Sequence, residues 1–320
     1  MGMRISVIGC GRWGSFITWY LCRAGHGLTL YGRSGSNNMT RLMNERKNDY
    51  LTLPESVTLT NSLAEALESE IIVISIGSQQ LDSLCTQMAQ LDVHGKTFVL
   101  CMKGLETGTC RRLSQITQSH FDGSCRVAVW LGPGHVQEFV RGIPNCMVID
   151  SEHEETKRRL IELFSSDLIR FYYGMDLIGN EIGAAAKNVI GIAAGMLDGY
   201  GLVTLKGALM SRGTREVARL IKAMGGNELS AYGLCHLGDY EATVFSEHSQ
   251  NRRFGELYMH GKCFDKLAEG YYTVQAMHQL AASTGVELPI CETVYNILYE
   301  KADAKSALDA LFNRSLKQEF

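Results

Sequence analysis

The chain has 320 residues, of which 45% are hydrophobic and 20% are charged, and its formal net charge is -3. This balance is that of a soluble globular protein, and the length suits two domains of roughly 150 residues with a small-ligand cleft between them. The charge offers no basic surplus for binding nucleic acid or an anionic membrane surface, so partners of these kinds are not indicated.

Ten cysteines are spread along the chain without a Cys-x-x-Cys pair or a four-ligand Cys/His pattern. We therefore predict no metal site and no disulfide framework, and we expect reduced thiols in a reducing compartment. The first residues run into an apolar strand without the features of a secretory signal, and no apolar run approaches the ~18 residues that span a bilayer. These features predict a cytoplasmic protein without membrane insertion.

Short apolar runs alternate with helical patterns in the first half of the chain. The first strand is expected at residues 4–9, followed by a glycine turn and a helix that continues to about residue 24. Further strands are expected at 28–31, 71–76, 97–101, 126–131 and 146–149. The alternation predicts an α/β domain whose mainly parallel sheet is covered by helices on both faces.

The pattern changes near residue 178. Residues 181–199 form a long helical stretch rich in small side chains, and strand patterns disappear after it. Later helices are expected at 206–224, 253–258, 273–284, 290–300 and 304–312. We therefore predict a nucleotide-binding domain at 1–178 and an all-helical domain at 179–320 that supplies the substrate-binding and catalytic groups.

A glycine triplet marks the first strand-to-helix turn, in the sequence Gly9-Cys10-Gly11-Arg12-Trp13-Gly14. This context is typical of a Rossmann-type dinucleotide site: Gly9 makes the tight turn, Gly11 lets the backbone approach a pyrophosphate, and Gly14 lets the helix pack on the strand. The phosphates then contact free N–H groups at the helix N-terminus. The alternative is a tight turn that binds nothing.

The end of the second expected strand indicates which cofactor is preferred. An NAD site usually has an acidic residue there, about 20 residues after the glycine turn, that binds the ribose 2′-hydroxyl. This chain instead has Arg33 followed by Ser34. A guanidinium suits a 2′-phosphate, so we favour NADP over NAD. The alternative is an exposed arginine without a role.

Two loops follow expected strands at their carboxyl ends, the edge at which ligands bind in open α/β sheets. Lys103 lies in the first loop, and the second has the sequence Gly132-Pro133-Gly134-His135. We expect both loops to face the ligand. The alternative for Lys103 is an ordinary surface lysine.

Lys187 lies among small apolar residues of the long helix, within Gly183-Ala184-Ala185-Ala186-Lys187-Asn188. Buried lysines are rare, and desolvation lowers the pKa of a lysine so that it can exchange a proton near neutral pH. Asp239 is a candidate to orient it. The alternative is a side chain that extends along the helix surface to water.

The segments described above, and the order in which they follow one another along the chain, resemble those of the bacterial NAD(P)-dependent glycerol-3-phosphate dehydrogenases. These are enzymes of phospholipid precursor synthesis. The glycine turn resembles the family's Gly-x-Gly-x-Trp-Gly, and the resemblance continues almost to the end of the chain. The other matching segments are Lys103-Gly104-Leu105, Gly132-Pro133-Gly134-His135, Lys187-Asn188-Val189, Ser211-Arg212-Gly213, Leu237-Gly238-Asp239, Asn251-Arg252-Arg253, Glu269-Gly270 and Glu287-Leu288-Pro289-Ile290.

The resemblance implies a reversible hydride transfer between a nicotinamide cofactor and C2 of dihydroxyacetone phosphate, without a metal. It implies that Lys187 exchanges the proton of the C2 hydroxyl and that Asp239 assists it. The other implied substrate-binding residues are Lys103, Gly132, Gly134, Ser249, Asn251 and Arg252. The implied cofactor-binding residues are Gly9, Gly11, Arg12, Trp13, Gly14, Arg33, Lys103, Val136 and Glu269. A homodimer is compatible with the sequence, which does not itself indicate an oligomeric state.

Three departures from the family bear on the substrate. Gly134 stands where the family usually has a hydroxyl side chain, the segment 203–209 is one residue shorter, and Gln250 replaces an arginine expected to contact the substrate phosphate. We expect Arg252 or Arg253 to compensate. Two alternatives remain: a related reductase that acts on another small hydroxy acid or phosphorylated alcohol, and a cofactor-binding regulatory protein without turnover.

Overall fold

The computed structural model describes residues 2–121 and 123–314. An eight-stranded sheet occupies the first half, with the strand order β3-β2-β1-β4-β5-β6-β7-β8. All neighbouring strands run parallel except β6 and β7. The strands are β1 (Arg4–Ile8), β2 (Gly27–Tyr31), β3 (Thr58–Thr60), β4 (Ile71–Ile74), β5 (Thr97–Leu100), β6 (Arg126–Leu131), β7 (Asn145–Ser151) and β8 (Ile169–Tyr173).

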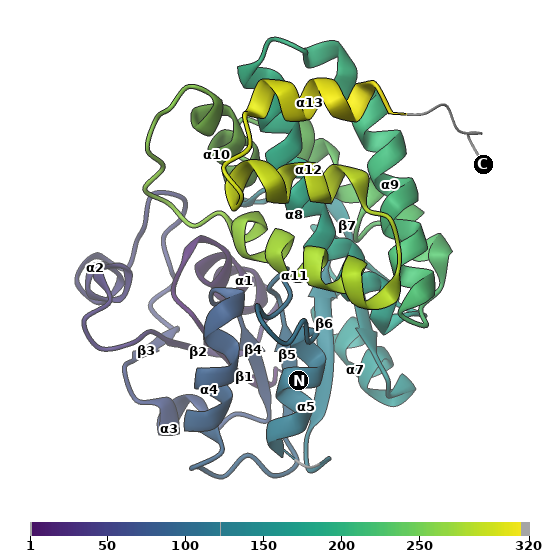
Figure 1. Cartoon of the computed structure of the whole chain (residues 1–320). Helices are drawn as coiled ribbons and strands as arrows, with labels where there is room; N and C mark the ends of the chain where they lie inside the picture. Colours follow the sequence, from purple (N-terminus) through teal and green to yellow (C-terminus); the bar gives the residue numbers. More distant parts are fainter. Residues whose placement is uncertain (1, 122, 315–320) are drawn as a thin grey trace.

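Helices cover both faces of the sheet (Figure 1). One face packs against α1 (Arg12–Arg23), α2 (Asn37–Glu45), α6 (Val136–Val140) and α7 (Glu154–Phe164). The other face packs against α3 (Leu63–Ala66), α4 (Leu81–Met88) and α5 (Leu113–Phe121). The central strands are continuous apolar runs because neither face meets water, and all four residues of β4 are buried.

The second half is helical, and no strand forms after β8 in the described part of the chain. Its main helices are α8 (Leu177–Gly199), α9 (Lys206–Ala223), α10 (Gln250–Met259), α11 (Glu269–Thr284), α12 (Pro289–Leu298) and α13 (Ala304–Phe312). Nearly all of α8 is buried, and Figure 1 shows α9, α10, α11 and α12 packed around it, with α13 against α12. A helix in which small and apolar residues predominate on all sides is expected at such a central position. Among the described helices, none is long and apolar enough to cross a membrane.

Glycines allow α8 and α10 to approach closely. A Cβ atom added to Gly195 of α8 would lie 1.8 Å from the carbonyl oxygen of Arg252, and one added to Gly255 of α10 would lie 2.1 Å from the carbonyl oxygen of Ile192. The two backbones are therefore in direct contact. This contact fixes α10, which begins at Gln250, against the helix that carries Lys187.

We expect Gly195→Ala to lower the free energy of unfolding by about 1–3 kcal/mol or more, because α10 must move away to admit the methyl group. Gly207→Ala is the matched control, since a Cβ atom at Gly207 of α9 meets nothing within 4 Å. That change should stabilise the protein by about 0.5–1 kcal/mol, the usual gain on replacing a helical glycine. Urea unfolding of both variants measures the difference, and equal stabilities would contradict the close packing.

The structure confirms the predicted Rossmann-type sheet followed by a helical domain. It adds two strands that the sequence pattern did not predict, β3 and β8. β3 has only three residues, and both strands lie at the edges of the sheet, where half-exposed side chains replace a continuous apolar run. Three helices begin three or four residues earlier than predicted: α8 at Leu177 rather than 181, α10 at Gln250 rather than 253, and α11 at Glu269 rather than 273.

Candidate active site

The glycine turn between β1 and α1 has the shape of a pyrophosphate site. Gly9 has a φ of +113°, and a Cβ atom at Gly14 would lie 1.8 Å from the carbonyl oxygen of Gly9. A Cβ atom at Gly11 would meet nothing within 4 Å, so the space beside it is open. No side chain caps the N-terminus of α1 and its first turn has no acidic residue. The N–H groups there fit a bound anion, as a dinucleotide pyrophosphate would supply.

Three other residues predicted to bind the cofactor lie on α1 and α6. Arg12 is the first residue of α1, and its guanidinium lies 5.9 Å from the ring centre of Tyr50. The indole of Trp13 lies 6.2 Å from the ring of Phe139 in α6. Val136, the first residue of α6, is buried. Since α1 and α6 are in contact, the structure brings these residues to one end of the sheet.

Arg33 and Glu269, which are also predicted to bind the cofactor, lie further apart. Arg33 is exposed, just beyond the carboxyl end of β2, where a ribose 2′-substituent would lie in a Rossmann-type site. Glu269 begins α11 in the helical half and accepts hydrogen bonds from the backbone N–H (3.0 Å) and the hydroxyl group of Ser78. Burial raises the pKa of Glu269. The Glu269–Ser78 contact therefore ties the helical half to the loop after β4.

Lys103, Lys187 and Asp239 form a compact group that we call the lysine cluster. The Nζ atom of Lys103 lies 2.6 Å and that of Lys187 lies 3.0 Å from the same carboxylate oxygen of Asp239. Asp239 is 1% exposed. Two ammonium groups thus share one buried carboxylate, which leaves a net positive charge facing the carboxyl edge of the sheet. Such a charge attracts an anionic substrate and stabilises a developing oxyanion.

Burial lowers the pKa of Lys187 to about 8. Desolvation is the largest cause and the charge of Lys103 acts in the same direction, whereas the charge of Asp239 opposes them. A lysine with this pKa is present in both protonation states near neutral pH. Lys187 can therefore give a proton to a bound ketone and accept one from the corresponding alcohol.

Thr243 is a contact of Lys187 that sequence analysis missed. Its hydroxyl oxygen lies 2.7 Å from the Nζ atom of Lys187. Thr243 follows Asp239 by four residues, in a helical segment whose last turn is Glu241–Phe245. This spacing places two side chains on one face, so it could have suggested that Thr243 and Asp239 reach the same group.

Asn188, next to Lys187, connects the two halves of the protein. Its amide nitrogen donates to the carbonyl oxygen of Lys103 (3.0 Å), and its amide oxygen accepts from Asn251 (3.0 Å). Asn251 in turn accepts from the backbone N–H of Gly270 (2.9 Å). This chain of hydrogen bonds holds the Lys103 loop, the start of α10 and the start of α11 in fixed relative positions.

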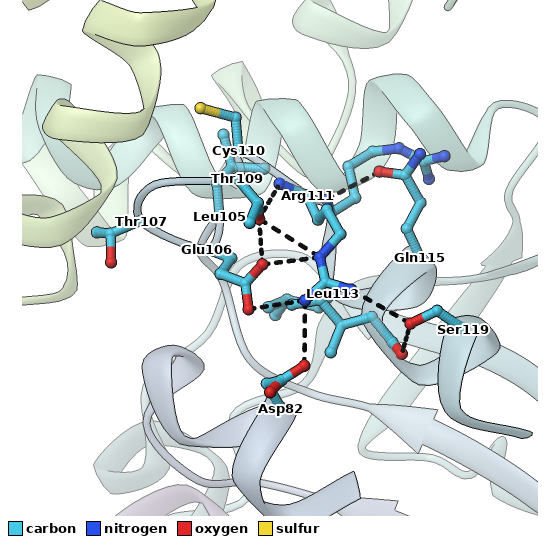
Figure 2. A network of polar contacts seen from close by, with 12 residues as sticks. Asp82, Leu105, Glu106, Thr107, Thr109, Cys110, Arg111, Leu113, Gln115 and Ser119 are labelled. Atoms are coloured by element: carbon cyan, nitrogen blue, oxygen red, sulfur yellow. Dashed lines mark hydrogen bonds and ion pairs between the residues drawn. The ribbon is translucent and has the colours of Figure 1, made fainter. Parts of the chain in front are cut away.

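A network of ion pairs closes the loop that follows Lys103 (Figure 2). The guanidinium of Arg111 contacts both carboxylate oxygens of Glu106, at 2.8 and 3.0 Å, and Asp82 of α4 at 3.1 Å. A backbone bridge joins Leu105 to Arg112 at the base of the loop. The planar fork of arginine suits such paired contacts with a carboxylate. The network restricts the loop and thereby the position of Lys103.

The second predicted loop, residues 132–135, contacts Lys103 directly. The Nζ atom of Lys103 donates to the carbonyl oxygen of Gly132 (2.7 Å). Gly134 has a φ of +145°, and a Cβ atom there would lie 2.3 Å from the ring of Phe139. The glycine at 134 is therefore required by the local backbone and by the position of Phe139, which explains the missing hydroxyl side chain.

The start of α10 carries the remaining residues predicted to bind substrate. Ser249 caps the helix by accepting from the backbone N–H of Arg252. The side chain of Arg252 is bound elsewhere, because its Nε atom lies 2.6 Å from the carboxylate of Asp198, which also binds Lys206. Arg253 is exposed. The structure thus pairs Arg252 with the carboxylate of Asp198, which argues against its compensating for the arginine absent at position 250.

Three buried polar atoms near the starts of α6 and α10 have no hydrogen-bond partner. They are His135 Nε2, Gln137 Oε1 and Gln250 Oε1, and only one other such side-chain atom occurs in the described part of the chain. Leaving a buried polar atom unsatisfied costs about 1–3 kcal/mol. A ligand atom that hydrogen-bonds here recovers that cost, so the three atoms mark this region as part of the candidate active site.

Comparisons with known proteins agree with this geometry. Residues 4–157 match the model of the NAD-dependent glycerol-3-phosphate dehydrogenase N-terminus, and residues 176–309 match that of its C-terminus. Proteins named glycerol-3-phosphate dehydrogenase, NAD(P)+, from Pelodictyon phaeoclathratiforme and Fusobacterium nucleatum are 34% and 35% identical, and each alignment covers at least 98% of both chains. A crystal structure of glycerol-3-phosphate dehydrogenase from Coxiella burnetii superposes with a TM-score of 0.91 at 28% identity, covering 98% of this chain and 99% of that one. The chain belongs to the NAD-dependent glycerol-3-phosphate dehydrogenase family.

Proposed function

We propose that this enzyme reduces dihydroxyacetone phosphate to sn-glycerol 3-phosphate with NADPH or NADH, and that the reaction is reversible. The observation that carries the proposal is the lysine cluster, in which Lys187 lies 3.0 Å from Asp239 and has a pKa of about 8. The curated relatives, which are named for this activity, support it.

Each group of the lysine cluster has a distinct part in the proposed reaction. When bound, the nicotinamide cofactor supplies the hydride that adds to C2 of the ketone. Lys187 donates the proton that the C2 oxygen requires, and takes it back in the oxidative direction. Lys103 stabilises the negative charge that develops on that oxygen. Asp239 holds both ammonium groups in place through contacts of 2.6 and 3.0 Å.

The substrate-binding proposal extends to the start of α10. Ser249 and Asn251 lie at its N-terminus, where backbone N–H groups and the helix dipole favour an anion. We place the substrate phosphate beside this helix end and the carbonyl group at the lysine cluster. Gly132 contributes its carbonyl oxygen as an acceptor for Lys103.

We also propose a domain boundary near residue 178, because β8 ends at Tyr173 and α8 begins at Leu177. A cytoplasmic location is proposed on the composition of the chain and on the bacterial relatives. A homodimer is proposed as the assembly to be tested by light scattering.

Steady-state oxidation of NADPH tests the proposed activity. We expect dihydroxyacetone phosphate to be reduced with a kcat/KM of at least about 10⁴ per molar per second, the lower end for ordinary enzymes. Small 2-keto acids without a phosphate should react far more slowly. Efficient reduction of a keto acid, or no turnover with either class of substrate, would reject the proposal.

We further propose that NADP is preferred over NAD, through Arg33. Arg33→Asp should raise KM for NADPH by about ten- to a hundredfold, because a hydrogen bond from a charged group to the 2′-phosphate is lost. KM for NADH should change little or fall, because aspartate can accept from a ribose hydroxyl. Measuring both KM values gives the answer, and equal effects on the two cofactors would show that Arg33 does not contact the ribose substituent.

A further inference from the structure

Two histidines meet where the loop before α6 faces the loop before α10, and we call them the histidine pair. The ring centres of His135 and His248 are 5.5 Å apart, with an edge-to-face angle of 77°. His135 is 9% exposed, whereas His248 is exposed. His135 belongs to the nucleotide-binding half and His248 to the helical half, so a ligand at this contact touches both.

The histidine pair lies in an environment that is rich in positive charge and in unused polar atoms. His135 Nε2 is buried without a hydrogen-bond partner, and so is Oε1 of Gln250, two residues from His248. Burial lowers the pKa of His135 to about 4. The charges of nearby groups add to this effect: Arg12, His248 and Lys187 lower the pKa, whereas Asp239 raises it.

The charged and titratable groups facing His135 come from four elements of the structure. Arg12 begins α1, Lys187 lies in α8, His248 precedes α10, and Asp239 ends the short helix Leu237–Asp239. The carboxylate of Asp239 is already shared by the two ammonium groups of Lys103 and Lys187. The cations of Arg12, Lys103 and Lys187 therefore outnumber the single carboxylate of Asp239, and the electrostatics favour a dianion beside the pair.

We propose that His135 and His248 bind the phosphate group of the substrate and thereby make the enzyme select a phosphorylated ketone. The proposal rests on the proposed function and extends it to residues for which the sequence suggested no such role. A neutral imidazole donates one N–H to a phosphate oxygen, and a protonated one donates two. The nearby N-terminus of α10 favours the same anion. Gln250 is neutral and cannot replace the charge of the family's arginine, so the histidine pair is the group that recognises the phosphate in this proposal.

The test compares two substrates that differ only in the phosphate, dihydroxyacetone phosphate and dihydroxyacetone. His248→Asn should lower kcat/KM for dihydroxyacetone phosphate by about ten- to a hundredfold, mainly through KM, since a charged hydrogen bond is lost. The same variant should keep its kcat/KM for dihydroxyacetone within about twofold, because bonds to a phosphate contribute nothing to that substrate. A merely structural role would lower both values together and would overturn the proposal.

His260→Asn is the matched control, because His260 is exposed at the opposite end of α10. It should leave both kcat/KM values unchanged. The ketone substrate and the cofactor NADPH both carry phosphate groups, and KM for NADPH shows which of the two the histidine pair contacts. A rise in KM for NADPH in His248→Asn, without a change in the preference for the phosphorylated ketone, would assign the pair to the cofactor and contradict the proposal.

Titration of the whole enzyme with inorganic phosphate separates this proposal from the proposed function. In the presence of NADP, phosphate should shift the imidazole proton signals of two histidines, and His248→Asn should weaken phosphate binding by at least about tenfold. If phosphate binds in this way but dihydroxyacetone phosphate is not reduced, the proposed function fails and the phosphate site stands. If the ketone is reduced but phosphate leaves the histidine signals unchanged, the phosphate site fails.

Discussion

Lys187→Ala is expected to lower kcat for ketone reduction by about 10²-fold or more, the usual contribution of a positioned general acid. The Nζ atom of Lys187 is held by Asp239 at 3.0 Å and by Thr243 at 2.7 Å, and alanine offers no group that can donate a proton from this position. NADPH binding should survive, because the glycine turn belongs to the other half of the chain. Steady-state kinetics and fluorescence titration with NADPH measure the two effects.

Lys157→Ala provides the control for the removal of a buried lysine. Lys157 is 6% exposed and donates to the carbonyl oxygen of Gly174 at 2.8 Å, away from the lysine cluster. Its loss should lower the melting temperature but leave kcat per folded molecule unchanged. Near-normal turnover in Lys187→Ala would show that Lys187 does not exchange the substrate proton, whatever the control shows.

Asp239→Asn is expected to affect both stability and the pH dependence of turnover. Removing one partner of a buried ion pair typically costs about 3–5 kcal/mol, and here two ammonium groups lose their shared carboxylate. Asp239 raises the pKa of Lys187, so its neutralisation lets that pKa fall below about 8. At neutral pH less of Lys187 is then protonated, and reduction slows. Activity should recover in part as the pH is lowered.

Asp198→Asn is the matched control for Asp239→Asn. Asp198 is also an aspartate between two cations, with Lys206 at 2.5 Å and Arg252 at 2.6 Å, and its side chain is 8% exposed. This variant should lose stability, yet the midpoint of its pH profile should stay where it is in the wild type. Thermal denaturation and kcat as a function of pH measure the two properties. The same pH midpoint in Asp239→Asn and the wild type would show that Asp239 does not control the proton affinity of Lys187.

The features that could be predicted from the sequence are those marked by patterns of neighbouring residues. The turn from Gly9 to Gly14 was recognisable because strand, glycines and helix are consecutive, and its backbone geometry is compatible with the expected roles. Lys187 stood out because small apolar neighbours imply a packed helix, and it is indeed buried. The central strands were found because burial on both faces makes them continuous apolar runs.

The missed features depend on contacts between distant segments. The pairing of Arg252 with Asp198 joins residues 54 positions apart, and no local pattern indicates it. The same holds for His135 and His248, which meet only when the two halves pack together. The need for glycine at position 134 comes from Phe139, whose ring position follows from the packing of α6 on α1.

The pH dependence of kcat/KM in both directions of the reaction tests the central claim most directly, that Lys187 exchanges the substrate proton. Its pKa is about 8. Ketone reduction requires the protonated amine, so kcat/KM for dihydroxyacetone phosphate should fall as the pH rises through this value. Oxidation requires the neutral amine, so kcat/KM for sn-glycerol 3-phosphate should rise over the same range. Both dependences should disappear in Lys187→Ala. Profiles that change in the same direction, or that persist in this variant, would contradict the account.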